Sequence, residues 1–101
     1  MIPKQKPLRI PKLLSSVVNM PCMYCGAIDG TIVAAHCPDR ILGGGGLGQK
    51  ADDCLVAALC FRCHNVVDSR EGSLDREARH LIWHQAYART VRQWFRDGVI
   101  K

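Results

Sequence analysis

The pattern of apolar and polar positions predicts two short strands and one long helix. Residues 30–36 combine β-branched and small apolar residues, and residues 54–59 form a second apolar run. Both runs have the length and composition of strands. From Ser73 to Asp97, apolar residues recur at three- and four-residue spacing, which predicts one helix capped by Ser73 and followed by Gly98. The expected apolar stripe of this helix is Leu74, Ala78, Leu81, Ile82, Val91, Trp94 and Phe95.

Shorter segments complete the predicted organisation. Residues 13–18 are largely apolar and are expected to dock as a helical turn, and residues 64–70 are expected to form a helix that ends at Gly72. The loop Gly43–Gly48 is too rich in glycine for a helix or strand, and it is interpreted as a hairpin tip. It is not a phosphate-binding P-loop, because Gln49 stands where the lysine is required. The predicted class is α+β.

The chain has 101 residues, of which 48% are hydrophobic, so it can form one domain with a single modest core. A chain of this size has a thin stability margin, and a covalent or metal staple would help it to fold. No apolar run is long enough for a membrane span, and no apolar block follows the first basic residues as in a secretory signal. A reducing compartment such as the cytoplasm is therefore expected.

Positive charge is concentrated at the N-terminus. The net charge is +5, and residues 1–12 carry four basic residues and no acid. Three prolines in the same stretch favour an extended arm, so residues 1–19 are expected to be a basic arm and residues 20–101 the folded domain. Such an arm can lie along nucleic-acid phosphate or can simply be solvated. The same two alternatives hold for the arginines that share one face of the long helix, Arg89, Arg92 and Arg96.

Four of the six cysteines form two Cys-x-x-Cys pairs, Cys22 with Cys25 and Cys60 with Cys63. In a reducing compartment, two such pairs indicate a tetrahedral structural zinc site. A redox-active pair is the alternative, and it explains one pair but not two. The gap between the pairs is much longer than the roughly 15–20 residues of a simple zinc ribbon, so an insertion separates the two halves of the site. Cys37 and Cys54 are left without an assigned role.

Three further residues suggest hydrolytic chemistry. His64 and Asp68 are four residues apart, so on a helix they face the same way and could hold one divalent ion. His36 ends the first predicted strand, and the cysteine pairs could bring it within reach of that ion, where an imidazole can activate water against a phosphodiester. Alternatively, His36 only caps a strand and His64 only hydrogen-bonds near the zinc. His80 and His84 also share a helix face, but no third ligand lies near them in sequence.

Taken together, these motifs resemble the zinc-containing HNH nucleases and, more narrowly, the small prophage-encoded nucleases of the YbcO-like family. The resemblance covers residues 20–101. It rests on the order of five motifs: Cys22-x-x-Cys25, Ala35-His36, Gly43–Gly48, Lys50-x-x-Asp53 and Cys60-x-x-Cys63-His64-x-x-x-Asp68.

This resemblance implies a ββα-metal fold in which His36 is the general base. It implies that His64 and Asp68 bind a catalytic divalent ion, Mg²⁺ or Mn²⁺, and that Asp53 replaces the asparagine that orients the hairpin. Ala35 is a departure from the pattern, because many HNH enzymes have an aspartate ligand at that position and alanine cannot coordinate metal through its side chain.

The expected function is therefore that of a metal-dependent DNA endonuclease, encoded by a phage or prophage and acting in DNA recombination or processing. A non-catalytic, zinc-stapled module that binds DNA or a protein partner is the main alternative, and a thiol-based redox protein is a third. Whether the chain forms a homodimer is left open. The residues expected to contact DNA are Lys50, Arg62, Arg89, Arg92 and Arg96.

Overall fold

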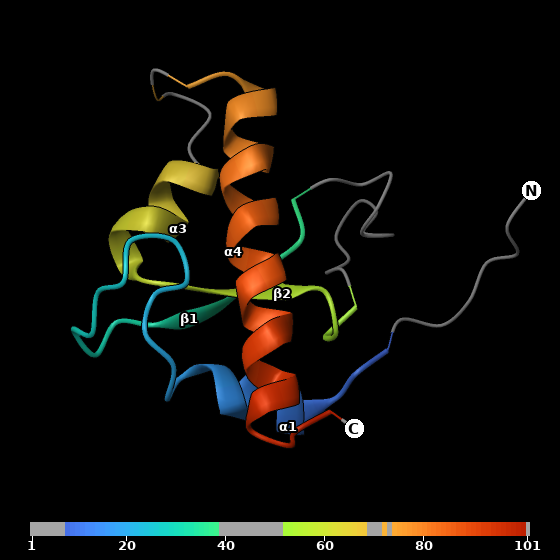
Figure 1. The fold of residues 1–101 in the computed structure, drawn as a ribbon. Coiled ribbons are helices and arrows are strands. Elements are labelled where there is room, and N and C mark those ends of the chain that lie inside the picture. The colour runs from blue at the N-terminus through green and yellow to red at the C-terminus, as the bar shows by residue number, and fades with distance from the viewer. Residues whose placement is uncertain (1–7, 39–51, 69–71, 73, 101) are drawn as a thin grey trace, which may run out of the picture.

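A computed structural model describes residues 8–38, 52–68, 72 and 74–100 of the chain. Within these residues the fold is a small α+β domain, as predicted. A two-stranded sheet lies at its centre, with helices packed around it (Figure 1). In chain order the elements are α1 (Pro11–Val17), β1 (Val33–His36), β2 (Val56–Leu59), α3 (Phe61–Asp68) and α4 (Arg76–Arg96).

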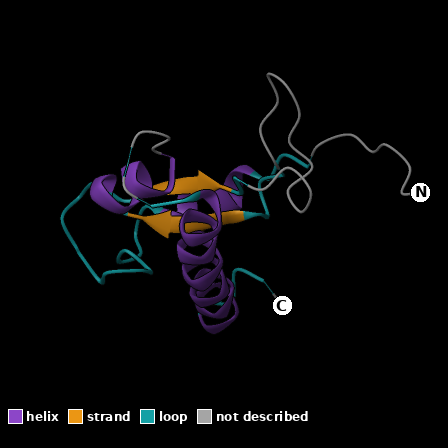
Figure 2. Cartoon of the chain, turned by 90° about the horizontal axis from the view of Figure 1, so that it is seen from above, coloured by secondary structure: helices purple, strands orange, loops and turns teal. Residues whose placement is uncertain are grey.

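The two strands form an antiparallel pair in which Val33 faces Leu59 and His36 faces Val56. Every residue of β2 is buried, whereas β1 is largely covered only at Ala35. This difference follows from the packing, because α4 crosses the sheet (Figure 2) and packs against β2. Both predicted strands are confirmed, with bounds two to three residues shorter at their N-terminal ends.

The long helix α4 is confirmed, but the sequence interpretation of its buried face is partly wrong. Its fully buried residues are Trp83, Ala86, Thr90 and Trp94. Leu81 and Phe95 were expected in the stripe, yet their side chains are 57% and 56% exposed. The face that contains the two tryptophans is the buried one, because its residues recur at three- and four-residue spacing and it buries the largest rings of the helix. Trp83 is held there by a 2.8 Å hydrogen bond from its indole N–H to the Ala35 carbonyl.

The ends of α4 are set by local capping. Asp75 is the N-cap, and its side chain accepts a 2.8 Å hydrogen bond from the Ala78 N–H. Ser73 was expected in this role, but the helix begins two residues later than that cap requires, and Ser73 itself lies outside the described residues. At the other end Gly98 adopts a φ of +73°, the left-handed conformation that follows many helix C-termini.

The N-terminal helix α1 packs under the C-terminal end of α4 (Figure 1). It begins at a proline, which is favourable in the first turn because proline lacks the N–H that would be unpaired there. Leu13 and Val17 are buried, and Ser16 accepts a 2.8 Å hydrogen bond from the indole N–H of Trp94. The predicted helical turn at 13–18 is thus confirmed as part of the core.

The predicted helix after the second cysteine pair is also confirmed, although it starts earlier, at Phe61. It packs beside the N-terminal half of α4, with Cys63 and Val67 turned inward. No helix in the described part of the chain is long and apolar enough to cross a membrane.

Candidate functional site

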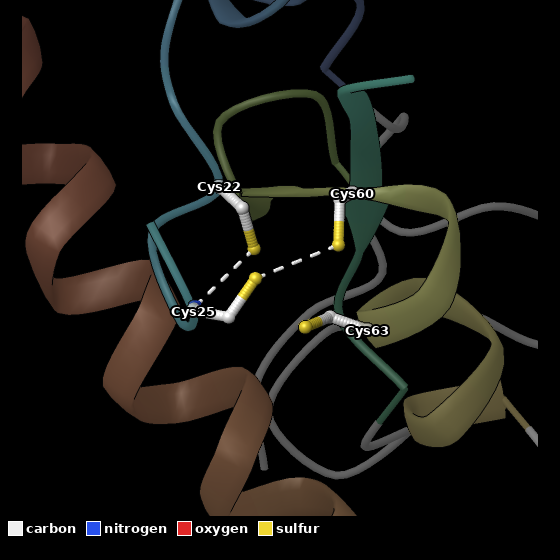
Figure 3. A group of neighbouring side chains, drawn as sticks. All are labelled: Cys22, Cys25, Cys60 and Cys63. Carbon is white, nitrogen blue, oxygen red and sulfur yellow. Dashed lines mark hydrogen bonds between the residues drawn. The ribbon is translucent and has the colours of Figure 1, made fainter. Parts of the chain in front are cut away.

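The four paired cysteines converge at one point (Figure 3). Cys22 and Cys25 lie on the loop before β1, Cys60 follows β2, and Cys63 is in the first turn of α3. Their Sγ atoms all lie within 4.8 Å of one another, and those of Cys25 and Cys60 are 3.7 Å apart. Among the described residues, no other His, Cys, Asp or Glu side chains form such a group of three or more.

This sulfur cluster fits a zinc ion. Zn–S bonds of about 2.3 Å in a tetrahedron place the sulfur atoms about 3.8 Å apart, close to the 3.7 Å between Cys25 and Cys60. The thiols also differ in acidity. Burial raises the pKa of Cys63 strongly, and hydrogen bonds among the thiols raise it further. The pKa of Cys22 falls to about 6, because backbone hydrogen bonds at Cys25, Cys60 and Tyr24 outweigh the effect of burial. A cation stabilises the thiolates of such a crowded set.

The first cysteine pair sits on a tight turn. The Gly26 N–H donates to the Cys22 carbonyl, the Cys22 N–H donates to the Ala27 carbonyl, and Gly26 has a φ of +83°. The turn is joined to the sheet by a 2.8 Å hydrogen bond from the Met23 N–H to the Ala58 carbonyl. These backbone contacts aim Cys22 and Cys25 at the same point. Gly26 suits this turn because glycine adopts a left-handed backbone without steric cost.

The side chain of His36 contacts the side chain of Asp53. The Nε2 atom of His36 lies 3.2 Å from Oδ1 of Asp53, and the two side chains are 20% and 4% exposed. Burial raises the pKa of Asp53, but hydrogen bonds from His36 and the Ile10 N–H, together with the charge of Arg9, bring it below its usual value. The carboxylate is therefore ionised and accepts from Nε2. In the neutral imidazole this leaves Nδ1 as the basic nitrogen.

Asp53 and its neighbour Asp52 also hold the N-terminal segment. Asp52 accepts a 2.8 Å hydrogen bond from the Leu8 N–H, and Asp53 accepts a 2.7 Å bond from the Ile10 N–H. The Asp53 N–H in turn donates to the Leu8 carbonyl at 2.9 Å. The end of the basic segment is thus fastened beside His36. Sequence reasoning missed this clasp, since its partners are more than forty residues apart and only the adjacent pair of acids hinted at it.

The second pair of candidate residues lies on α3. Nε2 of His64 and Oδ2 of Asp68 are 2.9 Å apart, with side chains 34% and 57% exposed. The four-residue spacing predicted this shared face. One imidazole nitrogen and one carboxylate in contact can supply two ligands to a divalent ion, leaving further positions for water or a phosphate oxygen.

The structure thus forms two pairs, His36 with Asp53 and His64 with Asp68. The strand register places His36 opposite Val56, at the end of β2 away from Cys60 and α3. Val56 is three residues from Leu59, the end of β2 that precedes Cys60, and three residues are roughly 10 Å of strand. His36, His64 and Asp68 do not form a single compact ligand group within the described residues.

The predicted DNA-contacting residues are distributed over several elements. Arg62 is exposed on α3, and Arg92 and Arg96 are exposed on α4. Arg89 is different, because its Nη1 donates to the Met23 carbonyl at 2.9 Å and so braces the first cysteine turn. Lys50 and the glycine-rich loop lie outside the described residues.

Comparison with known proteins gives consistent results. The family model described as "Putative nuclease YbcO" matches residues 15–99. The putative nuclease YbcO of Escherichia coli (strain K12) is 32% identical over 77 residues, which are 76% of this chain and 78% of that protein. The putative nuclease ybcO of Enterobacteria phage 82 matches with the same values. A solved structure of a putative bacteriophage protein from Escherichia coli str. K-12 substr. MG1655 has a TM-score of 0.56 and 25% identity, covering 82% of this chain and 88% of that one.

Proposed function

The chain belongs to the YbcO family of putative nucleases, and from this premise we propose that it is a metal-dependent, HNH-type DNA endonuclease. The reaction would be hydrolysis of a phosphodiester bond. The names of the relatives support a phage or prophage origin, and a role in DNA recombination or processing in the cytoplasm of a bacterial host belongs to the same proposal.

The observation that carries the proposal is the contact between His36 and the buried carboxylate of Asp53. A general base needs one nitrogen free to take a proton and a fixed ring orientation. Asp53 supplies the orientation by accepting from Nε2, and it stabilises the imidazolium that forms when Nδ1 takes a proton from water. A histidine that only capped a strand would not need a buried anionic partner.

In this proposal His64 and Asp68 hold the catalytic divalent ion, Mg²⁺ or Mn²⁺. Such an ion would supply charge stabilisation for the phosphate and the leaving oxygen. Ala35 contributes only its backbone carbonyl, which is already used by Trp83. Among the described residues the site therefore offers few side-chain ligands, and water or an oxygen of the DNA phosphate would fill the remaining positions of the ion at His64 and Asp68.

The four-cysteine site has a purely structural role in the proposal. It joins the loop before β1 to the start of α3, and thus the strand that carries His36 to the helix that carries His64. Because β1 and β2 are only four residues long and the core is small, a zinc ion at this junction would contribute directly to folding.

The metal assignment can be tested by cleavage of supercoiled plasmid and branched DNA across a titration of Mg²⁺ and Mn²⁺. We expect His64→Ala and Asp68→Asn to raise the metal concentration needed for half-maximal cleavage by tenfold or more. His80→Ala, a histidine substitution on α4 outside both pairs, should leave that concentration unchanged. Equal metal requirements for all variants would contradict the assignment.

A non-catalytic DNA-binding module is the second candidate. It is favoured by the separation of His36 from the His64–Asp68 pair along the strand register. It is also consistent with the clasp that fastens the basic N-terminal segment to Asp52 and Asp53. Such a module would bind DNA in a salt-dependent manner and would be indifferent to substitution of His36.

A further inference from the structure

A groove lies on the exposed side of α3, separate from the cysteine cluster and from both candidate catalytic pairs. Its volume is about 460 Å³, within the roughly 300–1,000 Å³ range of small-ligand sites. It is bordered by α3 on one side and by Gly72, Leu74 and Arg79 on the other, and the N-terminal part of α4 lies beside α3 (Figure 1). The residues that line it are Phe61, Arg62, Asn65, Val66, Gly72, Leu74 and Arg79.

The lining combines an apolar surface with positive charge. Phe61 is 64% exposed, although burial of an aromatic ring is normally favourable, and Val66 and Leu74 are 37% and 41% exposed. The two charged residues in the lining, Arg62 and Arg79, are both cationic. An exposed aromatic ring beside guanidinium groups and an amide matches the chemistry of a nucleotide, which has a flat base, hydrogen-bonding edges and an anionic phosphate.

Helix geometry gives the position of the groove relative to His64 and Asp68, the proposed ligands of the divalent ion. Successive residues of a helix are rotated by about 100°. Phe61 and Asn65 therefore lie on the face next to that of His64 and Asp68, and Arg62 and Val66 lie one step further round. A strand whose phosphate is bound at His64 and Asp68 would place a neighbouring base over Phe61.

Arg79 connects the two helices that border the groove. Its Nη1 donates a 3.1 Å hydrogen bond to the Val67 carbonyl in the last turn of α3. Its Nε is buried and has no hydrogen-bond partner among the described residues. Because Nε is sealed from solvent, Arg79 contributes its positive charge to the groove wall, where an anionic group of the ligand would be stabilised.

We propose that this groove binds one unstacked nucleotide of a DNA strand, with its base on Phe61 and its phosphate near Arg62 and Arg79. The proposal rests on the proposed function for its choice of DNA as the ligand. It adds a base-binding subsite beside the metal pair, and it implies that the protein prefers substrates with a single-stranded or distorted segment, since a fully stacked base cannot reach the ring.

The test is a binding measurement that does not depend on cleavage. A fluorescein-labelled single-stranded oligonucleotide and an abasic strand of the same length are titrated with protein, without added divalent ions, and followed by anisotropy. We expect Phe61→Ala to weaken binding of the base-containing strand about tenfold and to leave binding of the abasic strand unchanged. Phe61→Tyr should restore binding, because the tyrosine ring also stacks.

Phe95→Ala is the matched control. Phe95 is 56% exposed on α4 and does not line the groove, so its loss should affect neither strand. Circular dichroism and zinc content confirm that each variant is folded. Unchanged binding by Phe61→Ala, or an equal loss on both strands, would overturn the groove proposal. So would a wild-type dimer that Phe61→Ala converts to monomer without any base dependence, since the groove would then be a contact between two copies of the chain.

These outcomes are separable from the fate of the nuclease proposal. Base-dependent binding by a protein that cuts no DNA supports the groove and contradicts the nuclease. Cleavage by a protein whose binding ignores Phe61 supports the nuclease and contradicts the groove.

Discussion

Nε2 of His36 lies 3.2 Å from the buried carboxylate of Asp53, and this contact joins the end of β1 to the residues that precede β2. The same carboxylate accepts a hydrogen bond from the Ile10 N–H. One aspartate thus orients the candidate general base and also anchors the N-terminal segment beside it. Both roles can be separated by experiment.

Asp53 should stabilise the fold in a pH-dependent manner. Although burial raises its pKa, its hydrogen bonds and the charge of Arg9 lower it below the usual value. A carboxyl group with a lowered pKa contributes stability at neutral pH that is lost as the pH falls through its folded pKa, which lies on the acid side of the usual aspartate value. Asp53→Asn should lower the free energy of unfolding at pH 7 by about 1–3 kcal/mol. In denaturant titrations, the gap between wild type and variant should close toward pH 3, and a constant gap would contradict this account.

Asp53→Asn should also affect activity through His36. An asparagine keeps the size of the side chain but removes the charge that stabilises the imidazolium, so the rate should fall and the acidic limb of its pH profile should move. Asp52→Asn is the matched control, because the Asp52 carboxylate accepts from the Leu8 N–H in the clasp and has no described contact with His36. An equal effect of both substitutions on the pH profile would show that Asp53 acts on the clasp and not on the base.

Removal of the metal from the cysteine cluster should unfold the domain. We expect one zinc ion per chain by elemental analysis, and chelation should lower the melting temperature and the helical signal together. Cys63→Ser should abolish stoichiometric zinc. Cys54→Ser is the control, because Cys54 lies outside the cluster, and it should retain the ion. Full zinc binding by the Cys63 variant would contradict the assignment of the ligands.

Thr90 on α4 should stabilise the fold through a hydrogen bond to the sheet. Its hydroxyl accepts a 3.0 Å hydrogen bond from the Ala58 N–H and donates to the Ala86 carbonyl at 2.8 Å. Thr90→Val keeps the shape but leaves a buried N–H unpaired, which should cost about 1–3 kcal/mol of unfolding free energy. Ser15→Ala, which removes an exposed local hydrogen bond, should change stability by less than about 0.5 kcal/mol. Similar values for the two variants in urea titrations would contradict this role.

Arg89 and Arg92, both exposed on α4, offer a test of the proposed DNA surface. If Arg92 contacts a phosphate, Arg92→Gln should weaken DNA binding and reduce the slope of log K against log salt by about one. Arg89→Gln should act differently, because Arg89 holds the Met23 carbonyl and its loss should loosen the first cysteine turn. Zinc release in the presence of a chelator measures that effect, and it should be faster for Arg89→Gln than for Arg92→Gln. If the salt dependence of Arg92→Gln equals that of wild type, Arg92 does not contact a DNA phosphate.

Local patterns predicted much of this molecule. The two Cys-x-x-Cys pairs predicted the sulfur cluster, because two residues between cysteines suffice to turn both thiols toward one ion. Runs of β-branched and apolar residues located β1 and β2, and helical spacing located α4, to within a few residues. The four-residue spacing of His64 and Asp68 predicted their contact on α3.

Contacts between distant segments were not predictable in the same way. The clasp between Leu8 and Asp52, and the bond from Arg89 to the first cysteine turn, join residues that no local spacing relates. The buried face of α4 was misread at Leu81 and Phe95, because hydropathy alone does not reveal which of two overlapping stripes meets the sheet. Asp53 was expected to orient the hairpin. Its contact with His36 depends on how the chain returns from residues outside the described part.

The role of His36 as the general base can be tested by DNA cleavage with His36→Ala. Wild-type and variant proteins, matched for zinc content and for affinity to the same DNA, are incubated with supercoiled plasmid and branched DNA in Mg²⁺ or Mn²⁺. The account predicts that wild type cuts and that His36→Ala is slower by about 10²- to 10⁴-fold while still binding DNA. Cleavage by the variant at the wild-type rate, or no cleavage by either protein on any of these substrates, would contradict it.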